Sequence, residues 1–247
     1  MTTSVDSWCY VFGIVPAGAE LSASEGSGPA AQLRLVEADG IAAVVGTPPD
    51  DRALGRAADL LEHDRVLGDI LSSGTPVLPM RFGAVMSDET AVAQELLRAH
   101  RDDLIAELES LRDRVQYTVK VRYEQDAVLR QVVAGHPEIE RLRSSADNDG
   151  TDAFDRQLRL GELVVKALEQ LRPADAAAVM EDIGTTADSR VHDASSPEDV
   201  LNAAFLVDRA RADDFERRVE KLAERHSGRL RVRLVGPAPA YDFVRSA

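Results

Sequence analysis

Residues that could carry chemistry are few and widely spaced in this 247-residue chain. The densest polar set is Glu62-His63-Asp64-Arg65, in which an imidazole beside a carboxylate could transfer a proton. No second histidine lies near this set in the sequence, so a charged helix face in contact with solvent is the simpler interpretation.

Motifs for metal, phosphate or nucleophile chemistry are absent from the sequence. The five histidines form no HxxxH or HExxH pattern, and Cys9 is the single cysteine, which excludes an internal disulfide. The phosphate-binding patterns GxGxxG and GxxxxGKS/T are missing, as is the GxSxG nucleophile motif. We therefore expect no enzymatic activity, no metal and no cofactor.

One segment, Val77–Gly83, instead combines apolar residues with proline, glycine and an aromatic ring. Arg81 follows the apolar run Val77-Leu78-Pro79-Met80, where a guanidinium must find acceptors or reach the surface. Two interpretations remain open. Arg81 pairs with an internal carboxylate that locks the strand, or it contacts a partner protein beside Phe82.

A second such segment, Gly236–Val244, lies near the C-terminus. Its prolines exclude a helix and remove strand donors, so the segment is expected to run extended, with Tyr241 and Phe243 on one side. These rings either complete the core or form an apolar docking patch. Together with Arg81 and Phe82 they are the candidate partner-binding residues.

The composition narrows the class of partner. A net charge of −14 argues against a nucleic-acid binder and favours mutual repulsion between free copies. Arg229, Arg231 and Arg233 alternate with apolar residues, which indicates either a solvated strand face or a contact for an acidic partner. With no secretory signal and no run of 18 apolar residues, the chain is expected in the cytoplasm and not in a membrane.

Hydrophobic periodicity predicts an irregular α+β arrangement for the first part of the chain. The expected elements are the strands Trp8–Val15 and Ile41–Val45, a helix from Asp50 or Asp51 to about Leu71, the segment Val77–Met86, and a helix capped by Ser87 whose apolar stripe is Leu97, Leu104, Leu108, Leu111 and Val115.

In the remainder of the chain, the hydrophobic pattern predicts the order strand, helix, strand, strand, helix, strand. The expected elements are the strand Tyr117–Tyr123, a helix Gln125–Ala134, a helix from about Asp152 to Leu171 that is stopped by Pro173, a strand Ser189–His192, a strand centred on Ala204–Val207, a helix Ala212–His226 and a strand from Leu230.

The predicted fold class is therefore α+β with two domains. Residues 1–112 form an irregular, modified ferredoxin-like α+β domain. Residues 113–247 form a ferredoxin-like βαββαβ domain with a helical insertion and an extended C-terminal tail. Helices 152–171 and 212–226 are expected on one face of a four-stranded antiparallel sheet.

Four segments resemble the gas vesicle protein F/L (GvpL/GvpF) family over nearly the whole chain. They are Tyr10–Val15, Leu78–Gly83, Ala204–Asp208 and the Gly236–Val244 tail. The family tail is similar to Gly-Pro-Trp-Pro-Pro-Tyr-x-Phe, and here Ala238 and Ala240 replace the tryptophan and a proline.

The resemblance implies a non-enzymatic accessory protein of gas vesicle formation. Such a protein binds the hydrophobic shell subunit and other accessory proteins, and is found in the cytoplasm and on gas vesicles. Two other classes remain open. A small-molecule-binding regulatory module is compatible with a ferredoxin-like domain, whereas an enzyme on this fold needs a convergent polar pocket that no local motif supports.

Overall fold

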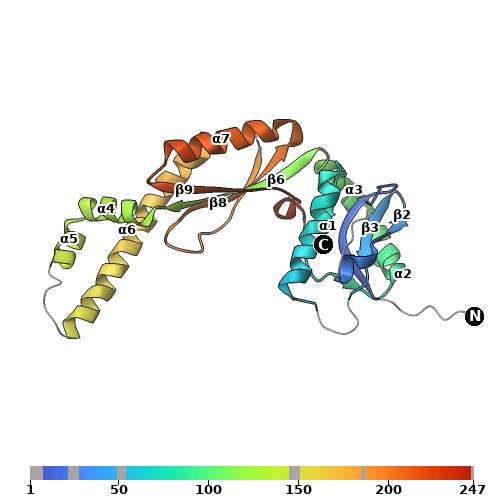
Figure 1. Ribbon diagram of the computed structural model, residues 1–247, viewed down its shortest axis with the longest axis horizontal. Helices are drawn as coiled ribbons and strands as arrows, with labels where there is room; N and C mark the ends of the chain where they lie inside the picture. Colours follow the sequence, from blue (N-terminus) through green and yellow to red (C-terminus); the bar gives the residue numbers. More distant parts are fainter. Residues whose placement is uncertain (1–7, 22–27, 49–53, 145–150, 185–186, 246–247) are drawn as a thin grey trace, which may run out of the picture. The chain divides into compact units, whose positions relative to one another are not determined.

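The computed structural model describes residues 8–21, 28–48, 54–144, 151–184 and 187–245. It has the predicted α+β fold class, with two antiparallel sheets accompanied by helices (Figure 1). The chain divides into two compact units, Met1–Gln116 with Pro237–Ala247, and Tyr117–Gly236. By its contacts, the C-terminal segment thus groups with the first unit, whereas the sequence-based division placed it in residues 113–247.

The sheet of the first unit has the order β2-β3-β1-β4, with β5 also paired to β1. Its strands are β1 (Cys9–Pro16), β2 (Arg34–Ala38), β3 (Ile41–Gly46), β4 (Leu78–Pro79) and β5 (Val85–Met86). Nearly every residue of β1 and β3 is buried, as expected for apolar runs covered on both faces.

Strand β2 is missing from the sequence-based prediction. It pairs with β3 across the turn Asp39-Gly40, where both residues have positive φ angles (48° and 95°). An Asp-Gly pair between two apolar runs is the strongest short-range hairpin signal, because a two-residue turn of this hand matches the strand twist. That dipeptide could have revealed the hairpin.

The helices of the first unit are shorter than predicted. They are α1 (Ala57–Ser72), α2 (Glu89–Ala91), the π-helical segment η2 (Val92–Arg98), α3 (Arg101–Ser110) and the 3₁₀ turns η1 (Gly28–Gln32) and η4 (Tyr241–Phe243).

Two predicted helix starts are wrong. In the described residues α1 begins at Ala57, where the Asp59 carboxylate accepts the N–H groups of Gly55 and Arg56. The expected caps Asp50 and Asp51 lie outside the described residues. The cap of α2 is Asp88 rather than Ser87, because its carboxylate accepts the Ala91 N–H at 2.7 Å.

The single long helix predicted after Ser87 is interrupted. The π-helical segment η2 and the non-helical backbone of His100 separate α2 from α3, and Val115 belongs to a strand. All five residues of the predicted apolar stripe are nevertheless buried. Burial of the stripe therefore follows the sequence pattern, although the helix carrying it is broken.

The second unit has the predicted order of elements, and its four-stranded sheet has the order β7-β8-β6-β9. Its elements are β6 (Arg114–Tyr123), α4 (Gln125–Gly135), α5 (Pro137–Ser144), α6 (Thr151–Ile183), β7 (Asp188–Val191), β8 (Asp199–Asp208), the turn η3 (Arg209–Arg211), α7 (Ala212–Arg225) and β9 (Leu230–Ala238).

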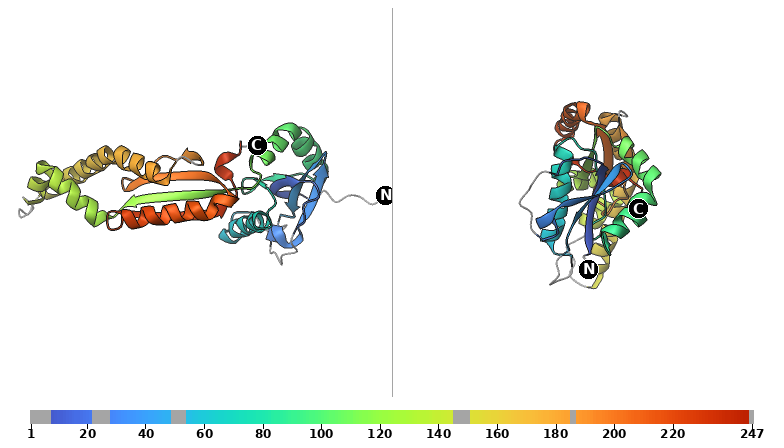
Figure 2. Two further views of the ribbon diagram at one scale, coloured as in Figure 1. Left: turned by 90° about the horizontal axis from the view of Figure 1, so that it is seen from above. Right: turned by 90° about the vertical axis from the view of Figure 1, so that its right-hand side faces the viewer.

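Helices α6 and α7 contact each other and both contact β8, so they share one face of this sheet (Figure 2). The Phe215 ring of α7 lies 5.3 Å from the rings of Tyr117 and Phe205, centroid to centroid. The alternating residues of β6 explain this arrangement, because its apolar side chains are buried while Lys120 and Arg122 are exposed.

Helix α6 does not stop at Pro173, as the sequence predicted, but continues to Ile183. Proline removes one helical hydrogen bond and crowds the preceding turn, at a cost of about 3 kcal/mol. Tertiary packing offsets this cost, since Leu168 lies buried before the proline while Val179 and Ile183 lie buried after it. None of the helices in the described part of the chain is both long and apolar enough to cross a membrane.

The C-terminal tail also differs from its prediction. Strand β9 runs through Pro237, which an edge strand of the sheet tolerates, and Tyr241–Phe243 then form a 3₁₀ turn. Tyr241 and Phe243 therefore do not lie on one side of an extended segment. The Phe243 N–H donates to the Ala240 carbonyl at 3.0 Å, which closes the turn.

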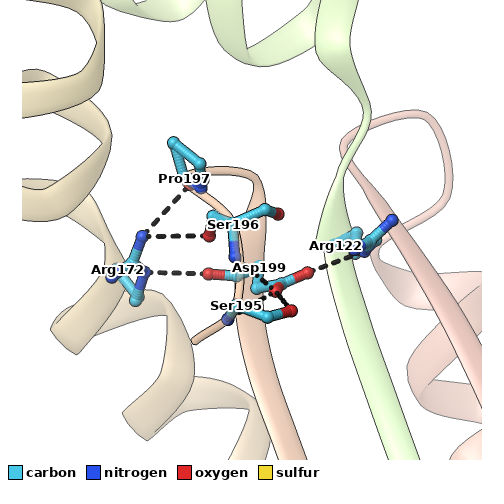
Figure 3. Close-up of polar contacts among 6 residues, drawn as sticks. All are labelled: Arg122, Arg172, Ser195, Ser196, Pro197 and Asp199. Atoms are coloured by element: carbon cyan, nitrogen blue, oxygen red, sulfur yellow. Dashed lines mark hydrogen bonds and ion pairs between the residues drawn. The ribbon is translucent and has the colours of Figure 1, made fainter. Parts of the chain in front are cut away.

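A buried carboxylate holds the loop between β7 and β8 (Figure 3). The Asp199 Oδ2 atom accepts the N–H of Ser195 at 2.9 Å, the hydroxyl of Ser195 at 2.7 Å and the N–H of Ser196 at 2.9 Å. Its Oδ1 atom accepts from Arg122 Nε at 2.7 Å. Burial alone raises the pKa of Asp199, but these donors together lower it to about 2.

Arg172 of α6 fastens the same loop from the other side. Its guanidinium donates to the carbonyls of Asp199, Ser196 and Pro197 at 2.8, 3.4 and 3.2 Å (Figure 3). Because Arg172 directly precedes Pro173, these bonds also hold the helix at the point where proline weakens it.

We expect Asp199→Asn to destabilise the second unit by about 2 kcal/mol at pH 7, because an amide cannot accept all these donors and leaves Arg122 without its anion. In the native chain the folded pKa lies below the unfolded value of about 3.9. This contribution is thus complete above pH 4 and is lost as the pH falls toward 2. Urea unfolding followed by circular dichroism measures both effects.

The matched control is Asp193→Asn, which alters an exposed carboxylate of the same loop. Equal stabilities of the two variants at pH 7 would contradict the role assigned to Asp199.

Candidate binding groove

Three segments that are distant in sequence enclose a groove of about 690 Å³ in the first unit. One wall is the loop after β4, the second is one face of α3, and the third is the C-terminal tail. The lining residues are Ile14, Leu78–Ala84, His100, Asp103, Leu104, Glu107, Tyr241, Val244 and Arg245.

The loop wall is fastened to β1 along its length. The Met80 N–H donates to the Phe12 carbonyl, and the Val11 N–H donates to the Ala84 carbonyl, both at 2.9 Å. Gly13 allows the close approach of β4, because a Cβ atom at this position would lie 2.8 Å from the Leu78 oxygen. The loop is therefore held against β1 by backbone hydrogen bonds at both of its ends.

A buried histidine joins β1, the loop wall and the tail wall behind the groove. His63 of α1 is 1% exposed, and its Nδ1 atom lies 2.8 Å from the Tyr10 hydroxyl. Its Nε2 atom lies 3.1 Å from the Met80 carbonyl oxygen and 2.9 Å from the Tyr241 hydroxyl. A carbonyl can only accept, so we assign the proton to Nε2, and Nδ1 then accepts from Tyr10.

The interpretation of His63 as part of a solvated charged face is therefore wrong. The signal that could have placed it correctly is helical spacing, because His63 precedes Val66, Leu67 and Ile70 by three, four and seven residues. All three are buried, so the imidazole belongs to the apolar stripe of α1.

Aromatic rings surround the imidazole and keep it neutral. The Phe12 ring stacks on His63 with centroids 5.5 Å apart, and the Phe82 ring meets it edge-on at 5.8 Å. Burial lowers the pKa of His63, raises the pKa of Tyr10 to about 12, and raises the pKa of Tyr241. These shifts favour the neutral form of each group, and the hydrogen bonds of the cluster join β1, the loop after β4 and the tail.

The tail wall has a second anchor. Gln116 Nε2 donates to Asp242 Oδ2 at 2.5 Å, and the Asp242 N–H donates to Gln116 Oε1 at 3.0 Å. Ala240 is 4% exposed, so the tail also fills part of the core. No sequence pattern pointed to Gln116, because its pairing with Asp242 spans 126 residues.

The candidate residues from the sequence have different positions. Arg81, Phe82 and Tyr241 line the groove, whereas Phe243 is half-buried and does not. The Arg81 side chain is exposed rather than enclosed in the strand. For Tyr241, the hydroxyl bonds to His63 while the residue lines the groove, so it contributes both to the core and to the groove surface.

The arginine row predicted in the last strand is largely paired within the chain. The Arg229 guanidinium contacts Asp175 at 2.7 Å, and Arg231 contacts Glu124 at 3.0 Å. No group of three or more His, Cys, Asp or Glu side chains among the described residues could hold a metal ion.

Comparison with known proteins identifies a family. The family model described as gas vesicle synthesis protein GvpL/GvpF matches residues 8–245. A gas vesicle protein F from a Streptomyces species is 33% identical over 239 residues, which cover 95% of this chain and 98% of that protein. A gas vesicle protein L from the same organism is 33% identical over 196 residues, covering 74% of this chain and 67% of that protein.

Solved structures share the fold. The crystal structure of gas vesicle protein GvpF from an Anabaena species has a TM-score of 0.79 and 22% identity, with 98% of this chain and 99% of that chain covered. The crystal structure of GvpF from Microcystis aeruginosa has a TM-score of 0.68 and 17% identity, with 97% of this chain and 99% of that chain covered.

The burial of the His63 imidazole leads to a prediction about how stability depends on pH. Because the folded pKa of His63 lies below the unfolded value of about 6.5, unfolding takes up a proton, and stability falls as the pH drops below 6.5. His63→Gln retains a donor and an acceptor but cannot titrate. We expect it to be less stable by about 1–2 kcal/mol at pH 7 and to lose this part of the pH dependence.

Unfolding free energies between pH 5 and 8 measure the effect, and His100→Gln, which removes an exposed histidine of the same unit, is the control. A His63→Gln profile parallel to that of the native chain would show that the imidazole is not held neutral.

Proposed function

The chain belongs to the gas vesicle synthesis protein GvpL/GvpF family, and on this premise we propose that it is a non-enzymatic accessory protein of gas vesicle formation. It binds the hydrophobic shell subunit, and other accessory proteins, while the shell is assembled. The binding surface for the shell subunit is the groove of the first unit.

One observation carries this proposal: Met80 and Phe82 line the same groove as Tyr241 and Val244. These two segments are about 160 residues apart in the sequence, and the fold gathers their side chains at one surface. Half-buried apolar groups that line a groove of this size are suited to an apolar segment of a partner.

The rigidity of the groove favours binding. Backbone hydrogen bonds hold the loop wall, and the His63 and Gln116 contacts hold the tail wall. A surface ordered before binding loses little conformational entropy when the partner docks. The interaction can then be specific without a rearrangement of this unit.

The net charge suits a carrier of an apolar subunit. A protein with a large exposed apolar surface associates with itself before assembly unless a partner covers that surface. Because the net charge of this chain is −14, complexes that contain it repel one another and stay dispersed. The activity proposed here is therefore binding, with no chemical turnover.

Phe82→Ala and Val244→Ser test the groove. We expect each to weaken capture of a co-expressed, tagged shell subunit by about tenfold or more, because aromatic and apolar anchors at the centre of an interface dominate its free energy. Since the Phe82 ring also contacts Tyr10 and His63, thermal midpoints are measured in parallel.

The control is Phe154→Ser, which removes a 73% exposed ring on α6 of the second unit. Capture that survives both groove variants at full strength, or falls equally in the control, would contradict the proposed surface.

A further inference from the structure

The α3 wall of the groove carries two carboxylates. Asp103 and Glu107 are four residues apart on one helix, so they lie on the same face about one turn apart. Leu104, which also lines the groove, is buried beside them. Within the described residues neither carboxylate has a hydrogen bond or an ion pair, although most other acidic groups of α3 and its ends are paired.

The tail contributes the opposite charge. Arg245 lines the groove and is exposed, and it likewise has no ion pair among the described residues. The apolar side chains of Met80, Phe82 and Val244 line the same groove. The groove is thus lined by two carboxylates on α3, by the guanidinium groups of Arg81 on the loop and Arg245 on the tail, and by apolar side chains from the loop and tail.

From this distribution we infer that the groove selects an amphipathic segment whose apolar face is bordered on one edge by lysine or arginine. The apolar face covers Met80, Phe82 and Val244, while the basic edge pairs with Asp103 and Glu107. This inference rests on the proposed function, in which the segment belongs to the shell subunit.

Charge complementarity determines the choice of occupant. An apolar groove alone accepts many apolar segments with similar affinity, whereas unpaired charges on one wall penalise a segment that places the same charge opposite them. A segment with acidic residues at that edge meets two carboxylates and is rejected. Asp103 and Glu107 therefore determine which segment binds and in which orientation.

Two matched synthetic peptides test the inference without the shell subunit. Both have the same leucine-rich face, and one has lysines where the other has glutamates along one edge. We expect the lysine peptide to bind the full chain about tenfold more tightly than the glutamate peptide at low salt. The double variant Asp103→Asn/Glu107→Gln should remove most of this difference, as should raising the salt concentration.

A matched control separates the groove from the general acidity of the chain. Asp102→Asn/Glu109→Gln removes two exposed carboxylates of the same helix that do not line the groove, so it should leave the peptide preference intact. Equal binding of both peptides to the native chain would overturn the inference, as would an equal loss of preference in the two double variants.

The same variants separate this inference from the proposed function. If Phe82→Ala weakens shell-subunit capture but Asp103→Asn/Glu107→Gln does not, the groove binds the subunit and the charge selection is wrong. The opposite result is also informative. If the peptide preference depends on Asp103 and Glu107, but shell-subunit capture is unchanged in both Phe82→Ala and Asp103→Asn/Glu107→Gln, the groove has the selectivity inferred here and the proposed partner is wrong.

Discussion

The arrangement of the first unit depends on one buried hydrogen-bond cluster centred on His63. Its imidazole links β1 through Tyr10, the loop after β4 through Met80, and the tail through Tyr241. A buried polar group without a hydrogen-bond partner destabilises the folded state. Each segment must therefore stay in place for the polar groups of the others to keep their hydrogen bonds. The loop and tail walls of the groove are therefore positioned by the same contacts that stabilise the core behind them.

The second unit uses a related device. Asp199 and Arg172 hold a loop through backbone donors and acceptors, and the same loop lies at the start of the central strand β8. In both units a polar group that is largely removed from water fixes irregular chain segments that have no regular hydrogen-bond ladder of their own. These buried polar contacts thus hold the loops in place in a chain whose aromatic content is only 4%.

Binding and stability are linked in the proposed groove. Tyr241 has its hydroxyl on His63 and lines the groove, and the Phe82 ring contacts the imidazole edge-on. Changes at these positions alter both the surface and its support, whereas the side chains of Asp103, Glu107 and Arg245 lie on the walls without a partner in the described part of the chain. In the proposed binding mode, affinity and selectivity for a partner are thus carried by different residues of one surface.

Local pattern in the sequence by itself determined the α+β class, the order of elements in the second unit and the buried stripe from Leu97 to Val115, because periodicity reports which side of an element is apolar. Only the tertiary structure decided which distant groups bond to His63, that α6 continues through Pro173, and that the tail packs on the first unit. In each case the deciding contacts join residues far apart in the chain, such as Gln116 and Asp242, and local spacing contains no information about such partners.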